Sequence, residues 1–173
     1  SSVYYSVMPL GYVINNTDEC PNESGSYNGC DYTPVTLSDE NYIYTRTYQE
    51  PMSSDSGINQ DSDIVESITY FDGLGRPMQS IGIKAAPDKK DIVTHVGYDA
   101  YGRQDKDWLP YTETTGNLGS YRASSEASTN SFYNVSKYDN TTNPHSEKHL
   151  EASPLSRVLE QGAPGADWIV NKA

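Results

Sequence analysis

No stretch of this sequence is apolar for the roughly 20 consecutive residues that a bilayer-spanning helix needs. No amino-terminal signal peptide is visible, and the chain opens with Ser1-Ser2-Val3-Tyr4 instead of methionine. We therefore expect a processed chain, or a piece cut from a longer protein. Direct insertion into a membrane is not expected.

Bulky apolar side chains are scarce. The sequence has 2 Phe, 2 Trp and 3 Met beside 15 Tyr, and its apolar content is 35%. Tyrosine suits a half-wet sheet surface, because its ring packs while its hydroxyl stays solvated. A chain this polar buries only a thin core, so it is either small and marginal or leans on neighbouring protein.

Positive charge is also scarce, with 12 Lys and Arg against 24 Asp and Glu and a net charge of -12. Such a surface repels phosphate backbones and anionic lipid. Nucleic acid is therefore not an expected partner, and neither is a membrane surface.

Cysteine is limited to Cys20 and Cys30, which flank nine residues rich in Pro, Asn, Gly and Ser. We expect a local disulfide that staples a loop without a hydrophobic core, with two unrelated thiols as the alternative. The spacing fits no zinc pattern. Residues 1–40 are read as an amino-terminal extension that holds this loop, and residues 41–170 as one β domain.

Strand patterns dominate the middle of the chain. Residues 41–48 alternate, with Tyr42, Tyr44, Arg46 and Tyr48 on one face. Two tandem β-hairpins with Gly-containing turns are expected between residues 63 and 111. Their predicted strands are 64–71, 78–85, 92–98 and 104–111.

The last third of the chain is less regular. Residues 120–138 favour a short helix or a loop equally, and a helix would place Phe132 and Val135 on one face. Residues 139–146 are expected to form a loop and 147–161 a strand, turn and strand. A final short strand is expected at 167–170.

An internal repeat is the most informative feature. Tyr70-Phe71-Asp72-Gly73-Leu74-Gly75-Arg76 aligns with Tyr98-Asp99-Ala100-Tyr101-Gly102-Arg103, and both the aspartates and the arginines are 27 positions apart. The segment 153–157, which ends at Arg157, is a degenerate third copy. These repeats predict turns at equivalent corners of neighbouring β-ribbons.

The repeated Tyr-Asp and Gly-Arg pairs resemble the YD repeat of the RHS family. The ordered series of motifs from Tyr70-Phe71-Asp72 to Gly162-Ala163-Pro164 is similar to the segment that opens the RHS region of large exported Bacteroidota proteins. The resemblance covers about residues 41–170. It implies a β-sheet ribbon that spirals into a hollow shell, which in many members encloses a toxic C-terminal domain. It also implies export, in some cases by the type IX route, to the periplasm, cell surface or exterior.

The motif residues have roles that follow from their chemistry. We expect Gly73, Gly75 and Gly102 to adopt the positive φ of tight turns. Asp72 and Asp99 are expected to accept backbone N–H bonds as Asx-turns. The remaining motif residues have pairing and packing roles. Arg76 and Arg103 would bind those aspartates or carbonyls of the next hairpin, and Tyr70 and Tyr98 would pack on adjacent repeats.

Catalytic and metal-binding patterns are weak. The sequence contains no Gly-x-Ser-x-Gly, phosphate loop or His-Glu-x-x-His. His145 and His149 are four apart, but Pro144 and Ser146 argue against a metal-binding helix face, and His95 is expected at a sheet surface. No cofactor is expected. Ca²⁺ binding or simple solvation could explain two acidic loops, one with Asp55, Asp61 and Asp63 and one with Asp18, Glu19, Glu23 and Asp31.

Three functions remain open at this point. The first is a non-catalytic structural segment of an RHS shell, whose partner is the remainder of its own chain. The second is a cell-surface binding module that contacts glycan, cation or protein, including motility or secretion proteins. The third, an enzyme domain, is the least favoured.

Overall fold

The computed structural model describes residues 3–6, 35, 37–49, 51, 61–113 and 118–170. Within it the chain forms two compact units. The first unit comprises Ser1–Ile92 and Glu113–Tyr121, and the second comprises Val93–Thr112 and Arg122–Ala173. The predicted boundary at residue 40 stays a prediction, because most of residues 1–40 lie outside the described ranges.

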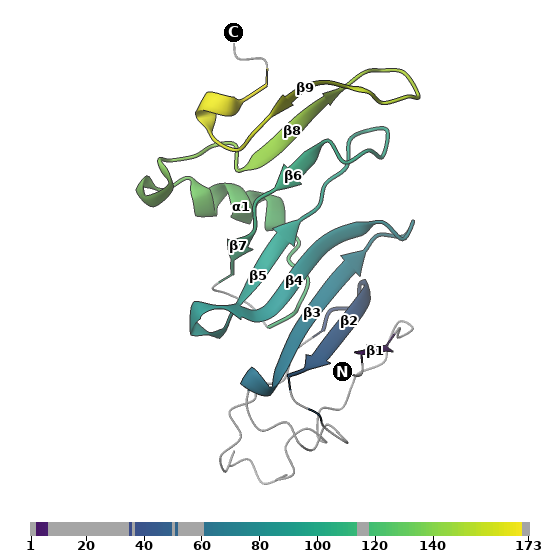
Figure 1. The fold of residues 1–173 in the computed structure, drawn as a ribbon, viewed down its shortest axis with the longest axis vertical. Coiled ribbons are helices and arrows are strands. Elements are labelled where there is room, and N and C mark those ends of the chain that lie inside the picture. Colours follow the sequence, from purple (N-terminus) through teal and green to yellow (C-terminus); the bar gives the residue numbers. More distant parts are fainter. Residues whose placement is uncertain are drawn as a thin grey trace. The chain divides into compact units, whose positions relative to one another are not determined.

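The described residues form a mainly β structure with two antiparallel sheets (Figure 1). The strand order is β1-β2-β3-β4-β5-β7 in one sheet and β6-β8-β9 in the other. The strands are β1 (Val3–Ser6), β2 (Asn41–Tyr48), β3 (Ile64–Phe71), β4 (Pro77–Ala86), β5 (Lys90–His95), β6 (Lys106–Trp108), β7 (Tyr111–Thr112), β8 (His145–Leu150) and β9 (Val158–Gly162).

The core of the first unit lies on one face of β2, β3 and β4. Along β3 the residues Ile64, Glu66, Ile68 and Tyr70 are buried, and Val65 and Ser67 between them are exposed. This alternation is the period of two that a strand imposes on its side chains. In register, Tyr44 lies opposite Ile68, and Ile68 lies opposite Ile81. Most of the buried side chains are aliphatic or tyrosine, as the composition predicts.

The second unit holds the one α-helix of the described residues, α1 (Ser125–Tyr133). In its sheet, Trp108 of β6 lies opposite His145 of β8. Trp108 and Tyr111 are buried aromatic residues of the second unit. Short 3-10 helices complete the fold: η3 (Asp61–Asp63) and η4 (Pro87–Lys89) in the first unit, and η5 (Ser136–Tyr138) and η6 (Ala166–Trp168) in the second. No described helix is both long and apolar enough to cross a bilayer.

The predicted strand 104–111 is wrong as a single element. It is split into β6 and β7, and β6 pairs with β8 instead of closing a long second hairpin. Pro110 explains the break because it has no N–H for a ladder, while Leu109 N–H bonds to the Pro144 carbonyl at 3.0 Å. The third strand also ends early, at His95. The isolated bridge Val96↔Asp107 joins the two arms of this hairpin.

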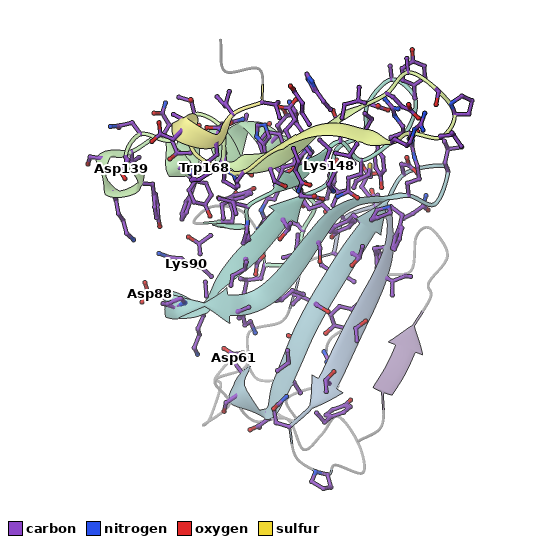
Figure 2. The ribbon with its side chains drawn as sticks, turned by 45° about the horizontal axis from the view of Figure 1, so that its top comes forward. Asp61, Asp88, Lys90, Asp139, Lys148 and Trp168 are labelled. Carbon is purple, nitrogen blue, oxygen red and sulfur yellow. The ribbon has the colours of Figure 1, made fainter. Side chains whose placement is uncertain are left out.

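Two further expectations are settled near the C-terminus. The strand predicted at 167–170 is wrong, because Gly165 has φ 105 and its carbonyl accepts the Trp168 N–H at 3.0 Å, which closes the 3-10 helix η6. The exposed Trp168 lies on this turn (Figure 2). The helical alternative for 120–138 is confirmed by α1, although Val135 lies beyond its end.

Candidate functional site: three arginine-anchored turns

The first repeat turn joins β3 to β4. Asp72 Oδ1 accepts the backbone N–H groups of Leu74 at 2.9 Å and Arg76 at 2.8 Å. Its Oδ2 accepts Nε–H of the Arg76 side chain at 2.7 Å. The backbone closes the same loop, with Asp72 N–H bound to the Arg76 carbonyl at 2.9 Å. One carboxylate therefore holds both the backbone and the side chain of this turn, as the Asx-turn prediction requires.

The second repeat turn reproduces this pattern in the second unit. Asp99 Oδ1 accepts Tyr101 N–H at 2.8 Å and Arg103 N–H at 2.9 Å, and Oδ2 accepts Arg103 Nε–H at 2.8 Å. Asp99 N–H bonds to the Arg103 carbonyl at 2.9 Å. The alignment of the two segments by sequence thus identifies the same local structure twice.

Each turn uses one glycine for its backbone conformation. Gly75 and Gly102 both have φ 77 and stand one position before the arginine. The predicted positive φ at Gly73 is wrong, because that residue is not in the left-handed region. The hydrogen bonds to the aspartate require only one left-handed residue, so Gly73 has no conformational role of this kind.

The carboxylates of these turns are tuned by the bonds they accept. The Arg76 backbone N–H is the largest cause that lowers the pKa of Asp72, and the Arg103 backbone N–H does the same for the pKa of Asp99. Both groups are charged at neutral pH. Their contribution to folding is therefore present above the ordinary carboxyl pKa and is lost as acid protonates them.

In the degenerate third turn, between β8 and β9, two residues share the roles that a single aspartate has in the other turns. Ser153 Oγ accepts Leu155 N–H at 3.2 Å, which is the backbone role of the aspartate. Glu151 Oε1 accepts Nε–H of Arg157 at 2.9 Å, which is the side-chain role, and this bond lowers the pKa of Glu151. Ser156, with φ 50, stands where the other turns have glycine.

Arg103 joins the second turn to the third. Its Nη1 donates to the Glu151 carbonyl at 3.0 Å and lies 3.3 Å from Ser156 Oγ. Its guanidinium also stands 5.1 Å from the centre of the Tyr101 ring. Arg103 therefore makes both predicted contacts, one with its own aspartate and one with a carbonyl of the next hairpin. Arg76 makes the first of these, with Asp72.

Tyr70 is the buried anchor of the first unit. Its hydroxyl donates to the Gly119 carbonyl at 2.7 Å, and its ring meets Tyr42 and Tyr121 edge to face at 6.0 and 5.4 Å. This side chain packs on β2 and on the segment around Gly119, which the sequence analysis did not predict. Tyr98, its counterpart in the second unit, is half-buried.

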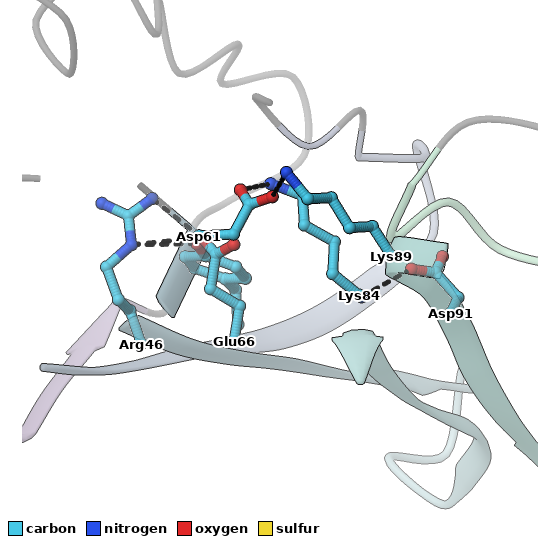
Figure 3. Close-up of polar contacts among 7 residues, drawn as sticks. Arg46, Asp61, Glu66, Lys84, Lys89 and Asp91 are labelled. Carbon is cyan, nitrogen blue, oxygen red and sulfur yellow. Dashed lines mark hydrogen bonds and ion pairs between the residues drawn. The ribbon is translucent and has the colours of Figure 1, made fainter. Parts of the chain in front are cut away.

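A buried charged network supports the first unit (Figure 3). Arg46 Nη2 lies 3.0 Å from Glu66 Oε1, which also accepts the hydroxyl of Tyr44. Arg46 and Glu66 face each other across β2 and β3. Each therefore offsets the charge of the other, which burial would otherwise penalise. Burial is the main cause that raises the pKa of Tyr44.

The second part of this network fixes the turn at η4. Asp61 Oδ1 lies 2.6 Å from Lys84 Nζ, and its Oδ2 lies 3.1 Å from Lys89 Nζ. Asp91 accepts Lys84 N–H at 3.1 Å and Gly119 N–H at 2.7 Å. The sequence alone does not reveal these partners, because they come together only in the folded unit.

The acidic loops proposed for Ca²⁺ lie mostly outside the described residues. The acidic residues outside the described ranges are Asp55, Asp18, Glu19, Glu23 and Asp31. Cys20 and Cys30 of the predicted disulfide also lie outside the described ranges. Asp61 is described, and two ammonium groups already occupy its carboxylate. Across the described ranges, no three His, Cys, Asp or Glu side chains are grouped so that they could hold a metal ion.

The histidines belong to the core and edge of the second unit. The prediction that His95 lies at a sheet surface is wrong, because it is half-buried, meets Trp108 edge to face at 5.6 Å and lies 2.8 Å from Ser125 Oγ. The ring centroids of His145 and Trp108 also lie close together, 4.4 Å apart. Burial is the main cause that lowers the pKa of both His95 and His145. His149 pairs instead with Glu160 at 3.3 Å.

The His95 and Ser125 pair has a structural role at the start of α1. Ser125 is buried, and its carbonyl accepts the Thr129 hydroxyl at 2.8 Å. A serine nucleophile must reach its substrate, and this serine is only 3% exposed. The pair therefore ties the first turn of α1 to the end of β5.

A family model described as a domain of unknown function (DUF6443) matches residues 44–173. No curated protein and no solved structure matches the chain.

Proposed function

This chain belongs to the DUF6443 family, and on that premise we propose that it is a non-catalytic structural segment of a large exported RHS-repeat protein. In this proposal it forms part of the wall of a β-shell, which can enclose a C-terminal effector. Its partner is the remainder of the same protein. Its place is the periplasm, the cell surface or the extracellular space.

The junction between the second and third turns is the observation that carries this proposal. Arg103 bonds to its own Asp99 and to the carbonyl of Glu151 in the next turn. Stacked hairpins need contacts that fix their register. A residue that closes one hairpin and also bonds to the next provides such a contact. The carboxylates of Glu66 and Asp61 are also paired with basic side chains of the same unit, which supports a structural role for them.

The test is the structure of the complete protein by electron microscopy. We expect residues 44–173 to lie within a continuous β wall, with strands before or after them that extend the same sheets. The proposal fails if this segment instead forms a separate globule that a flexible linker tethers to the rest.

A second candidate, a surface binding module, is favoured by one specific feature of the turns. Each turn displays one large apolar side chain two positions after the capping residue: Leu74, Tyr101 and Leu155, which are 79%, 78% and 71% exposed. Exposed apolar groups at repeated positions suit contact with another protein. Changing all three to serine should then abolish binding of the labelled chain to whole cells without lowering its melting temperature. Unchanged cell binding by this variant eliminates the candidate.

A further inference from the structure

The second unit contains one complete junction between successive hairpins. Strand β8 pairs with β6, and Arg103 supplies the side-chain contact beyond the turn. The Arg103 guanidinium divides its donors: Nε serves Asp99, and Nη1 serves the Glu151 carbonyl. Its side chain is 24% exposed as a result.

Arg157 stands at the equivalent place in the third turn but is open. Its Nε donates to Glu151 Oε1 at 2.9 Å, so the half that serves its own turn is in place. Its side chain is 70% exposed, and no described residue forms a hydrogen bond with its two Nη atoms. A guanidinium has five N–H donors in a fixed fork, so the donors that Arg103 gives to the next turn remain available in Arg157.

Strand β9 offers an edge beside this arginine. It is the last strand of its sheet, and among the described residues only β8 pairs with it. Residues 158–161 are exposed, and they include the apolar pair Val158 and Leu159. The far end of the strand is covered, because a Cβ on Gly162 would stand 2.5 Å from the Trp168 carbonyl oxygen. An uncovered edge presents unpaired backbone groups to an incoming strand.

From these observations we infer that residues 158–161 and Arg157 form a docking site for a further strand–turn–strand segment. Its first strand pairs antiparallel with β9, and Arg157 binds a backbone carbonyl of its turn, as Arg103 binds Glu151. The inference rests on the proposed function and adds the receiving surface and the residue that sets the register. The site suits a neutral carbonyl because Glu151 already balances the charge of Arg157.

Hydrogen exchange of the complete protein tests the docking site, with the 173-residue chain measured in parallel. We expect the amides of residues 158–161 to exchange on the order of tenfold more slowly in the complete protein. In the complete protein, Arg157→Gln should return them close to the rate in the short chain. The matched variant Arg103→Gln should instead speed exchange around 151–157 in both proteins, because its acceptor lies within this chain.

The outcomes separate the two proposals. If the wild-type amides exchange equally fast in both proteins, no strand pairs with β9 and the docking site is wrong, whereas the β wall is decided by the structure of the complete protein. If they are slowed in the complete protein and Arg157→Gln leaves them slow, the wall stands and the role of Arg157 is overturned. An equal effect of Arg157→Gln in both proteins overturns that role too, since it shows that Arg157 acts only within its own turn. Should this variant unfold the complete protein, Arg157→Lys decides, because it keeps the charge beside Glu151 but not the fork.

Discussion

The two units solve the problem of a thin apolar core in different ways. The first unit buries isoleucines with paired charges, as at Glu66 and Arg46. The second buries an indole, Trp108, in contact with two imidazoles, His95 and His145. The difference teaches that this chain compensates for scarce aliphatic residues with polar groups that must each keep a partner. The first unit should therefore be sensitive to loss of a charge, and the second to acid.

The largest expected effect is loss of the carboxylate from the first unit. Glu66→Ala removes the buried carboxylate that Arg46 Nη2 approaches at 3.0 Å and that accepts the Tyr44 hydroxyl, and it should cost about 3–5 kcal/mol of unfolding free energy. Urea denaturation measures this. Val65→Ala, at the exposed neighbouring position on β3, should change stability by about 0.5 kcal/mol or less. Equal effects of the two changes contradict the charged network.

The next effect compares two glycines that stand at different positions of the repeat turns. Gly102→Ala forces a side chain into φ 77 and should destabilise the protein by about 1–2 kcal/mol. Gly73→Ala introduces a Cβ with nothing within 4 Å and no left-handed backbone, so it should be tolerated. Thermal melting distinguishes them. If Gly102→Ala leaves the melting temperature unchanged, the assigned turn conformation is wrong.

An effect of similar size concerns the tyrosine anchor. Tyr70→Phe removes the hydroxyl that donates to the Gly119 carbonyl and should cost about 1–2 kcal/mol, because that acceptor stays buried. Tyr101→Phe removes a hydroxyl from an exposed ring of the second unit and should have no measurable effect. Chemical denaturation of both variants tests this contrast, which an unaltered Tyr70→Phe protein contradicts.

The smallest expected effect is the response of the second unit to mild acid. Burial lowers the pKa of His95 and His145 below the ordinary value of 6.5, so the unfolded chain binds more protons than the folded one beneath that pH. Lys106 adds to the lowering at His145, whereas Glu126 opposes it at both rings, and Glu147 and Asp105 oppose it at His145. Stability should therefore fall as pH drops from 7.5 to 5.5.

Melting curves at the two pH values measure this response, with histidine variants as the comparison. His95→Asn and His145→Asn together should flatten the pH dependence in this range. A pH dependence that survives in the double variant shows that other groups carry it.

Local structure could be predicted where one short segment contains all of its own determinants. The turns at 72–76 and 99–103 hold their acceptor, glycine and arginine within five residues, and strand β3 carries its own alternation. The mainly β fold follows from these patterns. The split of 104–111 was not predicted, because the choice between partners for β6 depends on β8, which lies far along the chain. The role of Glu151 in the third turn was missed for a similar reason, since it stands outside the repeat alignment.

By itself, the sequence determined strands β2, β3 and β4 and the Asp–Arg closure of two turns, because these depend on near neighbours. Tertiary structure alone decided that Glu66 pairs with Arg46, that the ring of His95 packs on Trp108, and that Arg103 bonds to the carbonyl of Glu151. Those contacts join residues separated by 13 to 48 positions. Strand register sets them, and it is fixed only when whole faces are buried together.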